Sequence, residues 1–421
     1  MKVLVIGGGS KEHAIVLKLS MSKHVNRIFC CPGNAGIAEL AECIDISPND
    51  LSAIIDFVKY EWIDLTIVGS EHLLPPGIVN ALEREGCRIL GPDRNSLPLR
   101  SSRVFVKDLL RLHRIPTPEY RVFSSYLHAQ DYIRLKGTPI VIKPAGYSGG
   151  NGAFIAYSTD AAEDILKRIM KDRIFSDAGR QVIVEEYLKG KRLSFTALTD
   201  GRTVIPLTSL QIYFQERAEN FMKSEMMVVG ACSPAPFFTK ESESLIMGII
   251  TRPLLKAFAS EGINYRGVFS TDLLIDKNGP KVLDLHFCFG DLEAPTILPR
   301  IRTDLIKLTM AVLEEQLSDM ALEWEQGSSV CVAMYSASGL QEGSVLKGLA
   351  LPFPEDSIFT FHENTSFLDA ELVTAGGRAV CITALGIDLH EARSKAYRAT
   401  ERISFEGMMY RNDIGDHSTN T

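Results

Sequence analysis

The first hundred residues alternate between short apolar segments and amphipathic ones, and this alternation restricts the fold more than any other feature of the chain. The pattern predicts strands at residues 3–6, 27–31 and 65–68, with helices between them at about 12–21 and 51–60. Strand–helix alternation is typical of a doubly wound parallel sheet whose site lies in the loops after the strands. We therefore predict an N-terminal α/β domain over residues 1–102.

The pattern changes from residue 103 onward, where strands outnumber helices and no longer alternate with them regularly. We predict a pair of α+β subdomains over residues 103–325, of which about 121–188 form a smaller lid, and a C-terminal β-rich domain over 326–421. The predicted strands are 140–143, 153–157, 181–186, 193–198, 204–210, 267–275 and 281–285, and the predicted helices are 104–113, 161–172, 242–260 and 389–402.

Composition excludes several classes of function. The 45 Lys and Arg residues are outnumbered by 52 Asp and Glu residues, and the net charge of −7 gives no basic excess for nucleic acid or acidic membranes. The eight cysteines show no metal-binding spacing, which indicates reduced thiols. Neither a signal peptide nor a run of about 18 apolar residues is present. We expect a cytoplasmic protein that binds no nucleic acid and no membrane.

A glycine run, Gly7-Gly8-Gly9, follows the first predicted strand. Such a run can bring backbone N–H groups and a helix N-terminus against a phosphate. A tight strand-to-helix turn explains it equally well. The dinucleotide spacing is broken because position 12 is Glu12, so NAD binding is disfavoured.

Lys143 ends a predicted strand and is followed by four glycines between residues 146 and 152. A hairpin of this kind could close over a nucleotide triphosphate, and Lys107 on the preceding helix could reach the same phosphates. A flexible hairpin with solvated lysines is the alternative. Glu185 and Glu186 end another strand, where backbone groups could contact an adenine edge, although acidic residues are common at strand ends.

Asp272, Asp284 and His286 lie on two predicted strands joined by a short turn. Asp284 and His286 share a face, and Asp272 could lie opposite them, an arrangement that suits Mg²⁺ held between carboxylates and phosphates. A histidine on a strand is more often a core residue than a ligand. The next turn carries Asp291 and Glu293, which either serve the site or are ordinary turn residues.

Taken in order, these segments resemble the phosphoribosylamine–glycine ligase family, whose fold is ATP-grasp, over nearly the whole chain. The segments that carry the resemblance are 1–7 with Glu12-His13-Ala14, 32–36, 63–69 with Glu71, 105–108, 139–143, 289–291 with Glu293, Gly376-Gly377-Arg378 and 383–386.

The resemblance implies a reaction in which ATP phosphorylates the carboxylate of glycine and the amine of 5-phosphoribosylamine attacks the acyl phosphate. It implies ATP with Mg²⁺, with Mn²⁺ as the alternative metal, small-molecule substrates, and a monomer or homodimer. The implied roles are catalysis by Lys143, Asp291 and Glu293, metal binding by Asp272, Asp284 and His286, nucleotide binding by Lys107, Lys143, Gly149, Gly150, Glu185, Glu186 and Leu188, and substrate binding by Gly9, Lys11, Gly33, Asn34, Gly36 and Glu71.

The chain departs from the family pattern at several of these positions. Asn151 stands where the family has a loop lysine, and Cys288 where it has an arginine. Lys191 and Arg192 replace acidic residues, and either could supply the missing charge. At the metal strand, Asp284 and His286 replace Glu and Asn. Of the family's acceptor loop, the segment 224–234 keeps only Gly230, Ala231, Ser233 and Pro234.

Three hypotheses remain open from the sequence. The chain is a divergent phosphoribosylamine–glycine ligase, an ATP-grasp ligase for another acid or amine, or a non-catalytic nucleotide-binding protein. The whole-chain resemblance favours the first. The altered acceptor segment and Cys288 favour the second, and Asn151 with the changed metal residues favours the third. We place the first ahead.

Overall fold

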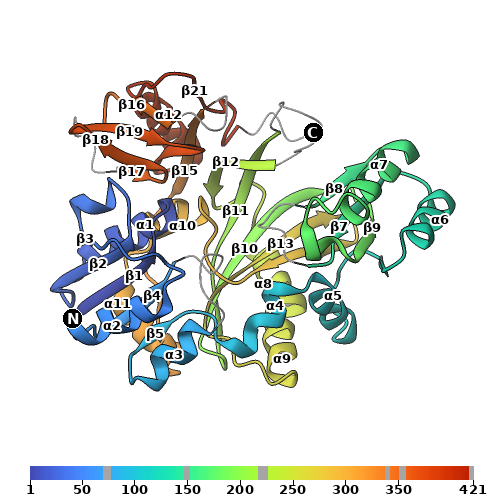
Figure 1. Cartoon of the computed structure of the whole chain (residues 1–421), viewed down its shortest axis with the longest axis horizontal. Helices are drawn as coiled ribbons and strands as arrows, with labels where there is room; N and C mark the ends of the chain where they lie inside the picture. Colours follow the sequence, from blue (N-terminus) through green and yellow to red (C-terminus); the bar gives the residue numbers. More distant parts are fainter. Residues whose placement is uncertain (70–76, 147–151, 217–225, 337–341, 350–356, 417–421) are drawn as a thin grey trace.

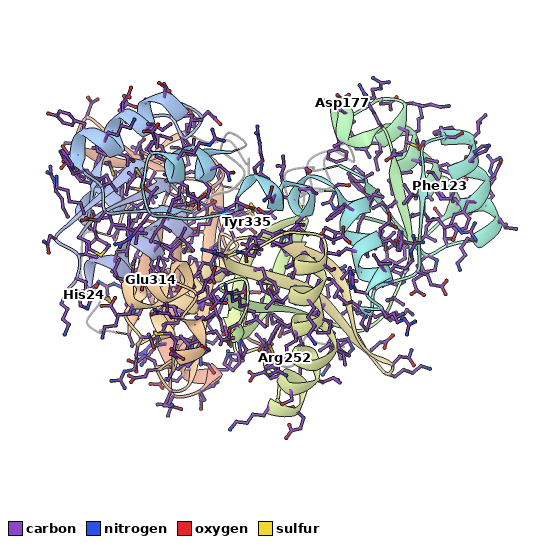
Figure 2. All side chains as sticks on the ribbon, turned by 90° about the horizontal axis from the view of Figure 1, so that it is seen from below. His24, Phe123, Asp177, Arg252, Glu314 and Tyr335 are labelled. Atoms are coloured by element: carbon purple, nitrogen blue, oxygen red, sulfur yellow. The ribbon has the colours of Figure 1, made fainter. Side chains whose placement is uncertain are left out.

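The structure is a computed structural model of the 421-residue chain and describes residues 1–69, 77–146, 152–216, 226–336, 342–349 and 357–416. Figure 1 shows the N-terminal and C-terminal parts together at one end and a smaller lid at the other, with long strands between them. Figure 2 gives the same arrangement from below, with Phe123 and Asp177 in the lid and His24 at the opposite end.

The N-terminal part contains the predicted doubly wound parallel sheet, so this prediction is confirmed. Its five strands are all parallel, in the order β3-β2-β1-β4-β5. The strands are β1 (Lys2–Gly7), β2 (Arg27–Pro32), β3 (Glu42–Cys43), β4 (Leu65–Val68) and β5 (Ile89–Leu90). The helices are α1 (Ser10–Ser20), α2 (Leu51–Glu61) and α3 (Ile78–Arg84). The loops after β1 and β2 meet at one edge of this sheet, as parallel strands require.

The lid is a four-stranded antiparallel sheet in the order β6-β9-β7-β8. Its strands are β6 (Tyr120–Phe123), β7 (Ile140–Pro144), β8 (Phe154–Ala156) and β9 (Val182–Glu186), and its helices are α6 (Tyr126–Lys136) and α7 (Thr159–Met170). One face of the sheet packs against these helices in an apolar core that includes Ile133, Ile142 and Leu166. The side chains of Lys143 and Glu185 alternate with these core residues and so lie on the other face of the sheet.

A large antiparallel sheet forms the centre of the molecule in the order β14-β13-β10-β11-β12-β15-β20-β17, with β21 paired to β15. Its strands are β10 (Lys191–Thr199), β11 (Val204–Glu216), β12 (Met226–Ser233), β13 (Gly267–Asp276), β14 (Gly279–His286), β15 (Ser328–Ser336), β17 (Ile358–His362), β20 (Arg378–Gly386) and β21 (Met408–Met409). Because β12 pairs with β15, strands from the predicted central and C-terminal domains belong to one continuous sheet.

The acceptor segment illustrates where sequence reasoning was wrong. Residues 224–234 were compared with a loop, but residues 226–233 form β12, which pairs with both β11 and β15. The run Met226-Met227-Val228-Val229 consists of apolar residues with two β-branched ones, which suit a strand between two neighbours.

The predicted helix over 242–260 consists of three pieces. These are α8 (Lys240–Ile246), a π-helical turn (Met247–Thr251) and α9 (Arg252–Ser260). Pro253 lies in the first turn of α9 and has no N–H for a bond to the preceding turn, so the regular helical bonding is interrupted there.

The remaining elements complete the central and C-terminal parts. They are α4 (Leu97–Ser101), α5 (Arg103–Leu112), α10 (Glu293–Ile297), α11 (Leu305–Leu313), α12 (Leu389–Thr400) and a three-stranded sheet of β16 (Glu342–Val345), β18 (Thr365–Leu368) and β19 (Glu371–Ala375). In the described part of the chain, no helix is long and apolar enough to cross a membrane.

One apolar core is shared by all three parts of the molecule. Leu19 from α1, Leu298 after α10 and Phe361 from β17 belong to the same buried cluster. Burial of aliphatic and aromatic side chains is the largest favourable contribution to folding. The shared core therefore fixes the N-terminal sheet against the central sheet and the C-terminal strands.

Two buried histidines lie where the N-terminal and C-terminal parts meet. The backbone N–H of His362 donates to Nδ1 of His13 over 2.9 Å, and the two rings are tilted with centroids 5.6 Å apart. Gly36 packs against both rings, so that a Cβ there would lie 2.5 Å from His362 and 2.6 Å from His13. Burial lowers the pKa of His13 to about 3 and that of His362 to about 4.

Because these two histidines have lowered pKa values, we expect the free energy of unfolding to fall in mild acid. In the unfolded chain they bind protons below about pH 6.5, whereas in the folded protein they remain neutral, so stability falls as the pH falls. Between pH 6.5 and 5 each histidine is expected to cost up to about 2 kcal/mol. His13→Asn keeps an acceptor for the His362 N–H and should flatten this part of the stability–pH curve, measured by urea unfolding. Exposed His128→Asn is the control, and an equal flattening by both variants would contradict the prediction.

Candidate active site

Two buried lysines share one buried carboxylate on the inner side of the lid. Lys107 of α5 lies 2.9 Å from Oε1 of Glu185, and Lys143 of β7 lies 3.1 Å from Oε2. Lys107 also donates to Oγ1 of Thr117, and Lys143 to the carbonyl of Leu283 in β14. The lysines predicted to meet at the phosphates therefore do lie together, although their contact with a nucleotide stays a prediction.

The charges of this group are strongly coupled. Burial alone would raise the pKa of Glu185, but the adjacent ammonium groups of Lys143 and Lys107 hold it below its usual range. Burial, with the like charge of Lys143 adding to it, lowers the pKa of Lys107. The three side chains thus carry a net positive charge in a buried place, an arrangement that suits an anionic ligand.

A third cation, Arg103, lies between the end of β7 and strand β14. Its Nε lies 3.3 Å from Oδ2 of Asp284, and its Nη1 is 3.3 Å from the carbonyl of Pro144 and 3.4 Å from that of Gly146. Sequence reasoning missed this residue. Arg103 precedes Lys107 by four positions at the start of α5, so the helical period places both side chains on one face and could have revealed it.

Asp272, Asp284 and His286 converge as the strand pattern predicts. Asp272 pairs directly with Asp284 across β13 and β14, and Nε2 of His286 lies 3.1 Å from Oδ2 of Asp272. Burial alone would lower the pKa of His286, but Asp272 and Asp284 raise it to about 10. Among the described residues, no three ligand side chains are already arranged around a metal position. Metal binding stays a prediction.

Glu293 begins α10 and is enclosed by hydrogen-bond donors. Its Oε1 accepts from Ser194 over 2.7 Å, and its Oε2 accepts from Ser270 over 2.9 Å and from the backbone N–H of Gly290 over 2.8 Å. The side chain is buried. Glu293 therefore ties the turn at 290–293 to strands β10 and β13, and its predicted catalytic role is untested.

Asp291, in the same turn, is held by cations from two other parts of the molecule. Its Oδ1 lies 3.1 Å from Lys11 of α1, and its Oδ2 lies 2.7 Å from Arg378 of β20. Although burial opposes it, these two cations hold the pKa of Asp291 below its usual range. Asp291 is half-exposed, whereas Lys11 and Arg378 are buried. Arg378 lies in a segment that carries the family resemblance, but sequence reasoning gave it no role.

The predicted substrate-binding glycines lie beside this group. A Cβ on Gly8 would be 2.5 Å from the carbonyl oxygen of Gly33, so the loops after β1 and β2 touch through their backbones. The amide of Asn34 donates to the carbonyls of Gly8 and His362, each over 2.9 Å, and its Oδ1 accepts from the N–H of Ile37. The side chain of Asn34 therefore fastens the loop to the C-terminal part.

Glu12 closes the same region from α1. Its Oε2 accepts from the N–H of Gly9 over 2.7 Å, and a Cβ at either Gly7 or Gly69 would lie within 2.5 Å of the Glu12 side chain. Burial, partly offset by Lys11, raises the pKa of Glu12 to about 7. Gly9 is thus fixed at the start of α1, and its contact with substrate stays a prediction.

The hinge between lid and central sheet contains the other predicted nucleotide residues. Glu186 accepts from the N–H of Glu119 over 2.9 Å and from Lys281 over 3.0 Å, and Leu188 is half-buried in the connection to β10. The contact of Glu186 and Leu188 with adenine stays a prediction. Glu71, Gly149, Gly150 and Asn151 lie outside the described residues.

Lys191 and Arg192 differ in where they can act. The ammonium of Lys191 lies 5.1 Å from the ring centroid of Phe237. Side chains alternate along a strand, so Arg192 shares the face of Ser194, which bonds Glu293, whereas Lys191 lies on the opposite face. Of the two, Arg192 is the one placed to add charge to the site.

A cavity with mainly apolar walls lies between the N-terminal sheet and the central sheet. It is lined by residues after β4 and β5, by β13 and α11, and by Cys288. Cys288, which stands where the family has an arginine, is therefore one of the residues that line this cavity.

The lid, the central sheet and the lysines between them define the ATP-grasp class. Residues 101–294 match the profile described as "Phosphoribosylglycinamide synthetase, ATP-grasp (A) domain", residues 1–99 the N domain of that synthetase, and residues 330–417 its C domain. These matches cover the three parts of the fold described above.

The chain belongs to the phosphoribosylamine–glycine ligase family. It is 41% identical over 418 residues to "Phosphoribosylamine--glycine ligase" of Caldanaerobacter subterraneus subsp. tengcongensis, covering 98% of this chain and 99% of that protein. It is 37% identical over 423 residues to the protein of the same name from Escherichia coli K12, covering 99% and 98%.

Solved structures agree on the fold. The crystal structure of phosphoribosylamine–glycine ligase from Thermotoga maritima superposes with a TM-score of 0.82 at 22% identity, covering 98% of this chain and 100% of that one. Biotin carboxylase from Campylobacter jejuni, in complex with an ATP analogue, gives a TM-score of 0.76 at 15% identity, covering 98% and 94%. At these identities the likeness shows the shared fold.

From the hydrogen bonds of Glu293 we expect its replacement to lower the free energy of unfolding. In Glu293→Gln a neutral amide replaces the carboxylate, and its –NH₂ takes the place of one acceptor oxygen, so the charge-assisted bonds from Ser194, Ser270 and the Gly290 N–H become weaker. We expect a loss of about 1–3 kcal/mol in the free energy of unfolding, measured by urea denaturation. Exposed Glu323→Gln is the control and should change stability by less than about 0.5 kcal/mol. Equal stability of the two variants would show that the Glu293 bonds contribute little.

Proposed function

We propose that this protein joins glycine to 5-phosphoribosylamine at the expense of ATP, forming glycinamide ribonucleotide, ADP and phosphate in purine biosynthesis. The observation that carries the proposal is similarity over the full length to proteins named phosphoribosylamine–glycine ligase. All three domains of that family are matched, including the one in which the sequence departs most from the family pattern.

The arrangement of charges supports this chemistry. Lys107, Lys143 and Arg103 form a cationic group between lid and central sheet, and Lys11 with Asp291 forms a second group beside the N-terminal glycine loops. One group suits the phosphates of ATP, and the half-exposed Asp291 carboxylate of the other suits an amine. The end of β14 and the loop after it, residues 284–291, connect the two charged groups. Phosphoryl transfer and amide formation can therefore occur along one segment.

Lys143 and Lys107 would stabilise charge on the transferring phosphoryl group. When phosphates arrive, the ammonium groups can bind them while keeping Glu185 as a shared counter-ion. Preorganised cations of this kind need little rearrangement during the reaction. The lid carries Lys143, so its position relative to the central sheet sets where the phosphates lie.

Asp272 and Asp284 have the donor chemistry for Mg²⁺, because hard divalent cations prefer carboxylate oxygens. With His286 beside them, they would hold the metal at the nucleotide phosphates, where a bound Mg²⁺ neutralises phosphate charge. The pairing of the two carboxylates across β13 and β14 fits this role. His286 would add an imidazole nitrogen only after losing a proton, and Mn²⁺, which accepts such a ligand, is the second candidate.

We propose that this enzyme works in a reducing compartment. All eight cysteines are thiols without a disulfide partner, and five of them are buried. We propose a cytoplasmic location and small-molecule substrates. We propose a monomer or a homodimer.

The direct experiment measures ADP release with ATP, Mg²⁺, glycine and freshly generated phosphoribosylamine, against mixtures lacking one component. The proposal expects ADP only in the complete mixture, together with the mass of glycinamide ribonucleotide. ADP formed with another acid or amine instead would favour a changed substrate. ATP binding without turnover on any substrate would favour a non-catalytic protein.

Lys143→Met tests the nucleotide site. Removal of one cation from the phosphates should weaken ATP binding and lower kcat/KM for ATP by about 10²–10³-fold. The fold should survive, because Glu185 keeps Lys107 as its partner. Lys136→Met removes a lysine from the exposed end of α6 and is the control. Unchanged ATP affinity by calorimetry in Lys143→Met would remove this lysine from the phosphate site.

A further inference from the structure

Arg378 of the C-terminal part forms an ion network with all three parts of the molecule. Its Nη2 lies 2.7 Å from Oδ2 of Asp291 in the central part, and its Nη1 donates to the carbonyl of Val228 in β12 over 2.9 Å. Within its own part, it contacts both oxygens of Glu363 at 2.7–3.0 Å. The N-terminal part joins through Ser10, whose Oγ lies 3.1 Å from Oε2 of Glu363 and 2.9 Å from the backbone carbonyl of Asp291 and can donate to either.

The solvent exposure of the side chains in this ion network shows which of them a ligand can contact. The Arg378 side chain is 10% exposed and that of Lys11 is 5% exposed, whereas that of Asp291 is 46% exposed. The two cations therefore lie behind the carboxylate, one on each oxygen. A ligand that enters this region contacts Asp291 and not the arginine. A carboxylate held in this way is a fixed, ionised acceptor for an amino group.

We propose that Arg378 is a positioning residue that fixes Asp291 to receive the amino group of a substrate. This inference rests on the proposed function, because it takes the ligand of Asp291 to be an amine that takes part in the ligation. Two amines fit this chemistry, the amino group of glycine and that of phosphoribosylamine. The inference holds for whichever of them Asp291 meets, and the experiment separates them.

The planar guanidinium is needed for this arrangement. It binds Glu363 with two nitrogens while the same group reaches Asp291 and a backbone carbonyl. A lysine carries one compact charge and cannot make all of these bonds at once. Arg378→Lys should therefore keep part of the positioning of Asp291, and Arg378→Gln should lose nearly all of it.

A matched control exists in the same part of the chain. Arg411 donates from Nη1 to the carbonyl of Phe214 in β11 over 2.7 Å and pairs with Asp413 of its own domain. It thus links the C-terminal part to the central sheet as Arg378 does, but it bonds Phe214 and Asp413 rather than Asp291. Arg411→Gln removes a similar interdomain link and leaves the Asp291 carboxylate with its cations.

The experiment measures steady-state kinetics of Arg378→Gln, Arg378→Lys and Arg411→Gln, with ATP affinity by calorimetry and thermal unfolding on each sample. In Arg378→Gln, kcat/KM for glycine or for phosphoribosylamine should fall about 10²-fold, and in Arg378→Lys about 10-fold. ATP affinity should stay within about twofold, and Arg411→Gln should keep kcat/KM within about threefold. The amine whose kcat/KM falls is the one that Asp291 receives.

Two results would overturn the inference. One is equal loss in the Arg378 and Arg411 variants, which would make Arg378 an ordinary interdomain link. The other is unchanged kcat/KM for both amines in a folded Arg378→Gln protein. If Arg378→Gln does not fold, Arg378→Lys decides by the same criteria. An unmodified protein that forms no glycinamide ribonucleotide would instead overturn the proposed function, and the inference with it.

Discussion

The pairing of β12 with β15 is the constraint on which the rest of the site depends. Through it, the strands of the central and C-terminal parts form one sheet, and β20 follows β15 directly. Arg378 begins β20 and Val228 lies in β12, so the sheet itself brings the arginine to the edge where the turn with Asp291 lies. A mobile C-terminal domain could not hold a buried guanidinium against that carboxylate, because an unpaired buried charge is costly.

Local signals in the sequence were sufficient for much of the fold. The parallel sheet followed from strand–helix alternation, and the convergence of Asp272, Asp284 and His286 followed from period-two spacing on either side of a short turn. These features involve residues close in sequence, whose relative placement the backbone geometry nearly determines. The closeness of Lys107 and Lys143 was also expected, because each belongs to an element that precedes the same glycine-rich segment.

What could not be predicted depends on contacts between distant segments. Asn34 fastens its loop to His362, and Arg378 reaches Asp291, although no local pattern links either pair. Strand β12 was missed because comparison with a loop outweighed its apolar, β-branched sequence. The side chain of Glu185 serves as counter-ion to two lysines, whereas its predicted place at adenine stays a prediction. That role becomes visible only when α5 and β7 are placed around the end of β9.

The two ends of the site use the same electrostatic device. In each, two cations share one carboxylate, Lys107 and Lys143 on Glu185 and Lys11 and Arg378 on Asp291. The difference lies in exposure, because Glu185 is buried and Asp291 is half-exposed. At the end proposed for the nucleotide, the carboxylate is shielded and two cations surround it, which suits phosphate. At the end proposed for the acceptor, the carboxylate itself is presented, which suits an amine. The proposed joining of a phosphorylated acid to an amine needs a cationic group and a presented carboxylate close together. Residues 284–293 connect these two groups.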